Sequence, residues 1–305
     1  MPETVIKTTG VTKKYGKFSA VAELTMDVKE GDIYALVGQN GAGKTTLLKL
    51  LSGLSPVSSG EIEVLGQSTE KGLEKARSKV GCIIETPGFF PYLSAEKNIE
   101  YYRIQRGIKD TGCVKRALKF VGLSDTGSKK FKNFSLGMKQ RLGLALAVLN
   151  EPQVLLLDEP INGLDPMGIK EFREILQKLN KEKHTTILIS SHILGELSQL
   201  ATTYGFIRSG KLIEHISAHD LHGKCQSYFK LIVDDAPKAQ EVLKNLQVQN
   251  VQAIGKSEIH INGNTENPGE IIKALVENGV MVSQACPSGM NLEQYFVNLI
   301  GGYAE

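Results

Sequence analysis

Hydrophobic and polar residues alternate along residues 5–11 and 20–28, and this period of two is typical of β-strands with one buried face. A polar turn leads into an unbroken apolar run at residues 33–37, which predicts a strand that is buried on both faces. After a glycine-rich stretch, residues 44–51 show helical spacing. Together with a short strand at 61–65, the pattern predicts a β-rich start followed by a strand–helix unit.

The pattern becomes helical over residues 90–150. Ser94 is suited to cap a helix that reaches Gln105, and Gly122 ends a second helix at 114–121. We therefore expect an all-helical insert here.

Apolar runs at residues 80–84, 154–157 and 185–189 are suited to a parallel sheet that is buried on both faces. A helix is predicted between the last two runs, with these residues on one side: Ile169, Phe172, Leu176 and Leu179. A β-hairpin is predicted over residues 204–215. The alternation of strands and helices indicates a doubly wound α/β core.

The last part of the chain has its own pattern, and we place a domain boundary between 1–223 and 224–305. Its predicted strands are 228–233, 248–254, 258–261 and 280–285, and its predicted helices are 237–246, 268–278 and 292–299. This βαββαβ order with a trailing helix is typical of a small ferredoxin-like α+β module. We find no catalytic constellation in it, and the sequence leaves open whether it regulates, dimerises or braces the rest.

Composition narrows the classes of function. A net charge of +3, from 36 basic and 33 acidic residues, does not favour nucleic acid as a partner. The 4 cysteines lie far apart and form no CxxC pair, which fits a reducing cytoplasm better than a zinc site or a disulfide framework. The apolar runs are far shorter than the roughly 20 residues of a membrane-spanning helix. Any membrane role is therefore expected to depend on a partner.

Residues 38–45 fit the phosphate-binding pattern G-x-x-x-x-G-K-[ST], and they lie between a predicted buried strand and a helix, as that motif requires. Backbone N–H groups and the helix N-terminus bind phosphates there, the lysine reaches the β- and γ-phosphates, and the threonine binds Mg²⁺. The residues predicted to bind the nucleotide in this segment are Gly38, Asn40, Gly41, Gly43, Lys44, Thr45 and Thr46, with Lys44 also predicted to act in catalysis.

Two adjacent carboxylates, Asp158 and Glu159, end the apolar strand at 154–157. Hydrolysis of a triphosphate needs a positioned water molecule more than covalent chemistry. Asp158 is therefore predicted to hold Mg²⁺, and Glu159 to orient or deprotonate the attacking water.

A third segment, residues 133–142, lies just ahead of that strand, and here the chain resembles the ATPases of ABC transporters. Their signature is L-S-G-G-Q; this chain keeps Ser135 and Gly137 and departs at Phe134, Leu136 and Met138. The resemblance implies a P-loop core with a RecA-like parallel sheet and an antiparallel β-subdomain. It also implies that Ser135 and Gly137 contact ATP.

The resemblance spans residues 1 to about 220 and implies further roles. Tyr15 would stack on adenine, Asp165 would lie in the loop that contacts a second copy, and His192 would contact the γ-phosphate. Two copies would then enclose ATP between the signature of one and the glycine loop of the other.

Where the family has glutamine after the strand at 80–84, this chain has Glu85. The resemblance implies that this loop reaches Mg²⁺ and the attacking water on one side and the membrane subunit on the other. Glu85 is thus a candidate catalytic and metal-binding residue, and whether it ligates the metal or only couples to the membrane subunit stays open. With Glu85, the signature segment 134–142 and the terminal segment 295–302, the whole chain resembles the ATP-binding subunits of bacitracin-resistance and lantibiotic-immunity exporters.

The function implied is therefore an ATP-hydrolysing subunit that works as a pair, peripheral on the cytoplasmic face of the membrane, and drives a separate permease. An aromatic cluster would form part of the groove for that permease: Phe89, Phe90, Tyr92, Tyr101 and Tyr102. The alternative is a soluble ABC ATPase that acts in assembly or repair.

Overall fold

The structure is a computed structural model that describes residues 2–85, 88–225, 228–246, 248–262, 267–289 and 292–301. The end of the segment 295–302 lies outside the described residues. Contacts divide the chain into two compact units, Met1–Ala218 and His219–Glu305, which we call the first and the second unit.

The elements of the first unit include those that the sequence predicts for this part of the chain. They are β1 (Thr4–Tyr15), β2 (Phe18–Lys29), β3 (Ile33–Val37), α1 (Lys44–Ser52), β4 (Ser59–Val64), α2 (Glu70–Arg77), β5 (Val80–Ile83), α3 (Ala95–Gln105), α4 (Cys113–Phe120), 3-10 turns at Ser124–Thr126 and Phe131–Asn133, α5 (Leu136–Ala147), β6 (Val154–Asp158), α6 (Pro166–Lys183), β7 (Thr186–Ser191), α7 (Leu194–Leu197), β8 (Thr203–Arg208) and β9 (Lys211–Ser217). The sequence analysis did not predict α2 and α7. Only Ala76 of α2 is buried, so this helix has no apolar stripe by which a hydrophobic pattern could predict it. The Thr69 side chain caps its N-terminus by accepting a hydrogen bond from the Gly72 N–H.

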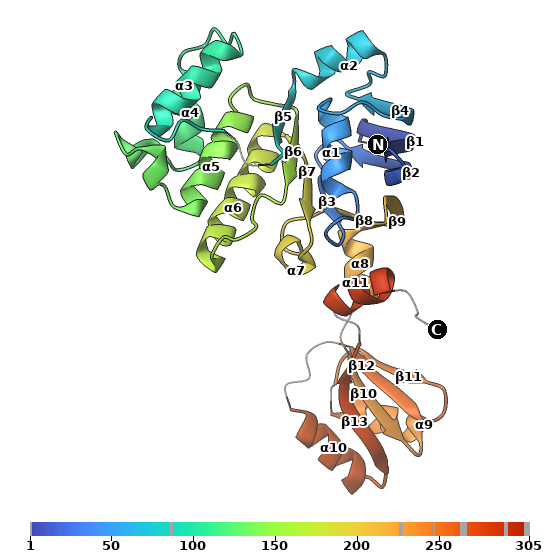
Figure 1. The fold of residues 1–305 in the computed structure, drawn as a ribbon. Helices are drawn as coiled ribbons and strands as arrows, with labels where there is room; N and C mark the ends of the chain where they lie inside the picture. The colour runs from blue at the N-terminus through green and yellow to red at the C-terminus, as the bar shows by residue number, and fades with distance from the viewer. Residues whose placement is uncertain are drawn as a thin grey trace. The chain divides into compact units, whose positions relative to one another are not determined.

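Two sheets enclose α1 (Figure 1). An antiparallel sheet has the order β2-β1-β4, and a mixed sheet has the order β5-β6-β7-β3-β8-β9. Leu47 and Leu51 of α1 pack in one buried cluster with Val11 of the antiparallel sheet and Leu36 and Leu156 of the mixed sheet. The predicted α/β core with an antiparallel subdomain is therefore confirmed.

The order of the mixed sheet positions the site. β3 pairs in parallel with β7, and β7 pairs in parallel with β6, with Asp158 opposite Ser190. The carboxyl ends of these strands meet at one edge of the sheet, which is where ligands bind in such folds. The glycine loop follows β3, the two carboxylates end or follow β6, and His192 follows β7, so all three are brought to the same edge.

The helical insert consists of α3, α4 and α5, which lie together away from α1 (Figure 1). Ser94 caps α3 as predicted, because its hydroxyl accepts a hydrogen bond from the Lys97 N–H. The buried Asn98 amide accepts from the Phe90 N–H and donates to the carbonyls of Phe90, Leu93 and Ser94. One buried side chain thus fixes the backbone of the loop before α3.

The second unit has the predicted element order and an antiparallel sheet. Its elements are α8 (Ala218–Lys224), which starts at the last residue of the first unit, β10 (Tyr228–Val233), α9 (Ala236–Asn245), β11 (Val251–Ile254), β12 (Glu258–Asn262), α10 (Pro268–Glu277), β13 (Val282–Ser288) and α11 (Leu292–Gly301). The strand order is β11-β12-β10-β13. Leu231 and Ile259 pack with Leu243 of α9 and Leu275 of α10, so the two helices share a core with the sheet.

No helix in the part of the chain that the structure describes combines the length and the apolar character needed to cross a membrane.

Gly205 of β8 leaves the space that a buried tyrosine fills. A Cβ at this position would lie 2.2 Å from the Tyr34 hydroxyl oxygen. We expect Gly205→Ala to lower the free energy of unfolding by about 1–3 kcal/mol, because the packed core cannot move away. Urea unfolding measures this.

Gly223→Ala is the control, since its Cβ would meet nothing within 4 Å and it lies outside the first unit. Equal unfolding midpoints for Gly205→Ala and the unchanged protein would contradict the packing argument.

Candidate nucleotide site

Gly43 shapes the glycine loop. It precedes the first residue of α1 with φ 108°, and a Cβ there would lie 2.4 Å from the Ala20 carbonyl oxygen. Only glycine fits without strain, so the loop can turn directly into the N-terminus of α1. Asn40 and Gly41 are exposed at the tip of the loop, and Thr46 is half-buried in the first turn of the helix.

The Lys44 side chain is 4% exposed and its ammonium has three partners. It donates to the carbonyl oxygens of Gly38, at 2.7 Å, and Gln39, at 3.2 Å. It also forms an ion pair with Glu159, with 3.1 Å between Nζ and Oε1. A buried ammonium needs such partners, and phosphate oxygens are equally able to supply them.

Asp158 is held by two hydroxyl groups. Thr45 Oγ1 donates to Asp158 Oδ2 at 2.7 Å, and Ser190 Oγ donates to Asp158 Oδ1 at 2.7 Å. These bonds tie the first turn of α1 and the end of β7 to the end of β6. The structure therefore brings together Thr45 and Asp158, the two residues for which the sequence predicted Mg²⁺ binding.

Glu159 has an unusual backbone and three side-chain partners. Its φ is 45°, in the left-handed region, and its N–H donates to Ser190 Oγ at 3.0 Å. Besides the ion pair with Lys44, its Oε2 lies 2.8 Å from His192 Nδ1 and accepts from Asn162 Nδ2 at 3.4 Å. The candidate base thus lies between the phosphate-binding lysine and the candidate γ-phosphate histidine.

A second glutamate, Glu196, interacts electrostatically with both Glu159 and His192. Burial raises the pKa of Glu196 in α7, the neighbouring His192 opposes that rise, and Glu159 adds to it. His192 is thus near two glutamates. Glu196 is absent from the sequence-based site because it lies in the unpredicted helix α7.

Glu85 follows β5 and contacts a residue that the sequence analysis did not single out. Its Oε1 lies 2.5 Å from the Lys49 ammonium on α1. Its backbone is also left-handed, with φ 63°. Its metal-binding role stays a prediction.

The other predicted residues lie in the first unit without touching the glycine loop through any described hydrogen bond. Ser135 caps α5 by accepting from the Met138 N–H at 3.3 Å, and Asp165 caps α6 by accepting from the Gly168 N–H at 3.2 Å. Tyr15 is 51% exposed beside the Lys13 ammonium, which lies 5.1 Å from its ring centre. A Cβ on Gly137 would lie 3.8 Å from Leu164 Cδ2, so the start of α5 packs beside the loop before α6.

The donor set fits a small hard cation. Hydroxyl and carboxylate oxygens are the ligands that Mg²⁺ prefers, and it binds through one or two carboxylates plus substrate phosphates. Among the described residues there is no group of three or more His, Cys, Asp or Glu side chains placed to hold a metal. The pair of Thr45 and Asp158 is therefore suited to a cation that a bound nucleotide helps to hold.

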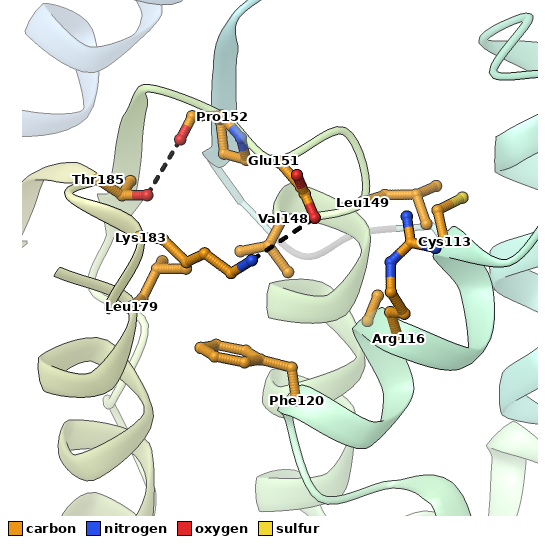
Figure 2. A pocket seen from close by; sticks show the side chains of 11 residues that line it. Cys113, Arg116, Phe120, Val148, Leu149, Glu151, Pro152, Leu179, Lys183 and Thr185 are labelled. Carbon is orange, nitrogen blue, oxygen red and sulfur yellow. Dashed lines mark hydrogen bonds and ion pairs between the residues drawn. The ribbon is translucent and has the colours of Figure 1, made fainter. Parts of the chain in front are cut away.

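A cavity of about 300 Å³ lies elsewhere, between α4, the α5–β6 connection and the end of α6 (Figure 2). Lys183 points across it to Glu151, with 3.8 Å between Nζ and Oε1. Its lining includes Pro152 and Thr185, which precede β6 and β7, so it lies at the amino ends of the strands. Because the predicted nucleotide residues lie at the carboxyl ends, this cavity is not part of their site.

Comparison with known proteins agrees with the geometry. The model of the ABC transporter family matches residues 21–162. The chain is 41% identical over 300 residues to the bacitracin transport ATP-binding protein BcrA of Bacillus licheniformis, covering 98% of both chains. It is 42% identical over 209 residues to the lantibiotic transport ATP-binding protein SrtF of Streptococcus pyogenes, covering 68% of this chain and 89% of the relative. The solved dimeric structure of MJ0796, a bacterial ABC transporter cassette, superposes with a TM-score of 0.63 at 25% identity over 70% of this chain and 98% of its own.

Sequence reasoning missed four polar residues of this site: Lys49, Glu196, Asn162 as a partner of Glu159, and Ser190 as a partner of Asp158. Ser190 had a partial signal, because it directly follows its predicted strand as Asp158 follows its own, but their pairing depends on the parallel register of β6 and β7, which only the structure shows. The contact between Lys49 and Glu85 had none, because it joins α1 to a residue 36 positions away.

We expect Glu159→Gln to slow ATP hydrolysis by on the order of 10² or more, the effect of losing a positioned general base. ATP binding should be retained, because Lys44 and the glycine loop, which are predicted to bind the phosphates, are unchanged in this variant. Release of phosphate measures the rate of hydrolysis, and an equilibrium titration with ATP measures binding. Glu182→Gln, at an exposed position of α6, is the matched control, and near-normal turnover of Glu159→Gln would overturn the assigned role.

Lys44→Ala should instead weaken ATP binding by at least about tenfold, because a charged donor to phosphate is worth roughly 1.5–3 kcal/mol. Equilibrium binding titrations test this, with the exposed Lys181→Ala as the control. Retained affinity in a folded Lys44→Ala protein would count against the phosphate-binding role.

Proposed function

Because this chain belongs to the ABC transporter family of ATP-binding proteins, and is an ATPase as they are, we propose that it powers the export of bacitracin- or lantibiotic-like peptide antibiotics. The observation that carries the proposal is the match to a bacitracin transport protein over 98% of both chains, C-terminal part included. That the exported substrate is a peptide antibiotic is inferred from the names of the bacitracin and lantibiotic transport relatives.

The residues of the site then have defined roles in hydrolysis. ATP binds with its phosphates on the glycine loop and the N-terminus of α1, and the Lys44 ammonium exchanges Glu159 for β- and γ-phosphate oxygens. This exchange frees the Glu159 carboxylate to accept a proton from the water whose oxygen attacks the γ-phosphorus, while the bond to the leaving ADP breaks. His192, 2.8 Å from Glu159, orients that carboxylate and contacts the γ-phosphate.

Thr45 and Asp158 would hold Mg²⁺, which when bound neutralises the charge of the β- and γ-phosphates. Ser190 keeps the Asp158 carboxylate in place for this, because its hydroxyl donates to Oδ1.

Two copies complete the site. Ser135 and Gly137 at the start of α5, and Asp165 at the start of α6, contact the nucleotide and the loop of the second copy. The N-terminus of α5 carries a partial positive charge that suits a phosphate. The likeness to a cassette solved as a dimer supports this arrangement.

The membrane partner binds exposed apolar side chains of the insert. Phe90, Tyr92, Tyr101 and Ile104 are 41%, 68%, 45% and 63% exposed. Rings of Phe90 and Tyr101 meet edge to face at 4.7 Å, and Asn98 fixes the loop that carries Phe90. We call these four residues, three aromatic and one isoleucine, the aromatic patch. Exposed apolar side chains beside a fixed loop suit contact with a helix of the permease, which holds this protein at the inner face of the membrane.

Residues 224–305 form the accessory domain of this subunit, with the ferredoxin-like order of elements. Its inclusion in the full-length match to the bacitracin transport protein supports a role in the same class of exporter.

A pull-down tests the proposal. The Glu159→Gln protein with Mg²⁺ and ATP, applied to detergent-solubilised native membranes, should recover a multi-span protein in stoichiometric amount by mass spectrometry. Phe90→Asp and Tyr92→Asp, made in that background, should abolish the recovery without lowering the urea midpoint, because a charge cannot enter an apolar contact unpaired. Met281→Asp, at a 70% exposed position of the second unit, is the control.

Recovery of soluble partners alone would favour the alternative, an ABC ATPase of assembly or repair. Unchanged recovery with both patch variants would remove the aromatic patch from the interface.

A further inference from the structure

An ion pair joins the end of β5 to α1. Lys49 follows Thr45 by four residues, so both side chains lie on one face of the helix. The Lys49 ammonium donates to Glu85 Oε1 at 2.5 Å. The pair therefore lies one helical turn from the hydroxyl that holds Asp158.

The surroundings of Lys49 are mostly negative. The hydrogen bond to Glu85 raises the pKa of Lys49, burial opposes that rise, and the negative charges of Glu85 and Asp158 add to it. Its ammonium therefore interacts electrostatically with the carboxylate proposed to hold the metal. The side chain is 31% exposed, and it extends from the helix whose N-terminus is proposed to bind the triphosphate.

The negative charge of Glu85 would repel a bound polyphosphate, and the ion pair with Lys49 compensates that charge. A carboxylate at the end of β5 adds a negative charge beside the end of β6, where Asp158 and Glu159 already lie and where a polyphosphate must bind. Like charges at such distances raise the free energy of the complex. Paired with an ammonium, the carboxylate has the net charge of the glutamine expected at this position.

We propose that Lys49 is a positioning residue for ATP binding: it holds the Glu85 side chain against α1 and so keeps this carboxylate away from the triphosphate. The inference rests on the nucleotide site proposed above. Lys49 needs no contact with the substrate for this role, since it acts through Glu85.

A double-mutant cycle distinguishes this positioning role of Lys49 from a simple effect of its charge on ATP. If both side chains act on ATP only through fixed charges, Lys49→Met and Glu85→Gln change the affinity independently. If Lys49 positions Glu85, the released carboxylate repels ATP more strongly, and Glu85→Gln then restores more affinity in the Lys49→Met background than in the unchanged protein.

The readout is equilibrium binding of metal-free ATP, measured by calorimetry in EDTA with the full chain, so that neither Mg²⁺ nor turnover enters. We expect Lys49→Met to weaken binding and the effect of Glu85→Gln to be about threefold larger in that background, the scale of partly exposed ion pairs. Lys49→Arg should bind ATP as the unchanged protein does, because it keeps the pair. Urea midpoints check that each variant is folded.

Lys183 and Glu151 provide a matched control cycle. Their atoms lie 3.8 Å apart, both side chains are exposed, and they line the cavity at the amino ends of the strands. Lys183→Met and Glu151→Gln should show no coupling in ATP affinity. Independent effects of Lys49→Met and Glu85→Gln, or unchanged affinity in Lys49→Met, would overturn the proposal. An unchanged protein that fails to bind ATP even when Mg²⁺ is present would instead overturn the nucleotide site itself.

Discussion

The Lys44 ammonium is buried at the base of the glycine loop, and a buried charge is tolerated only where partners surround it. Two loop carbonyls and the Glu159 carboxylate meet that need. To supply them, the loop after β3 must fold back over the lysine, which Gly43 permits, and the residue after β6 must turn its side chain towards it. The same groups that satisfy the lysine are those that ATP displaces or uses. The constraint on a single charge thus joins folding of the loop to the proposed chemistry.

Left-handed backbone at Glu85 and Glu159 is the second feature that shapes the site. Each glutamate follows the carboxyl end of its strand, β5 or β6, with positive φ. Such conformations cost of order 1–3 kcal/mol and persist where surrounding contacts hold them. Those contacts are the Ser190 hydroxyl, Lys44 and His192 for Glu159, and Lys49 for Glu85. Lys44 and Lys49, both on α1, therefore hold the two carboxylates, which suits groups that must stay in place beside a polyphosphate.

Much of the fold could be predicted from residue patterns, and the reasons are physical. β3 and β6 are apolar because both faces of a central parallel strand are covered, and Ser94 reveals the start of α3 because a helix needs a side chain to accept its free N–H groups. Where the pattern is weak, prediction failed: α2 buries a single alanine, and α7 has four residues. A helix without an apolar stripe is stabilised by its caps and neighbours, which a hydrophobic period cannot register.

The sequence by itself determined the phosphate-binding loop, the carboxylates after β6 and the order of elements, because each is a local pattern whose chemistry depends on neighbours along the chain. It also showed the departure at Glu85. Only the tertiary structure decided which partner each charge has: Glu159 with Lys44 and His192, Asp158 with Ser190, and Glu85 with Lys49. These contacts join residues far apart in sequence, and they depend on strand order and on the side of the sheet that α1 occupies. Packing of whole elements sets both, and no short pattern encodes them.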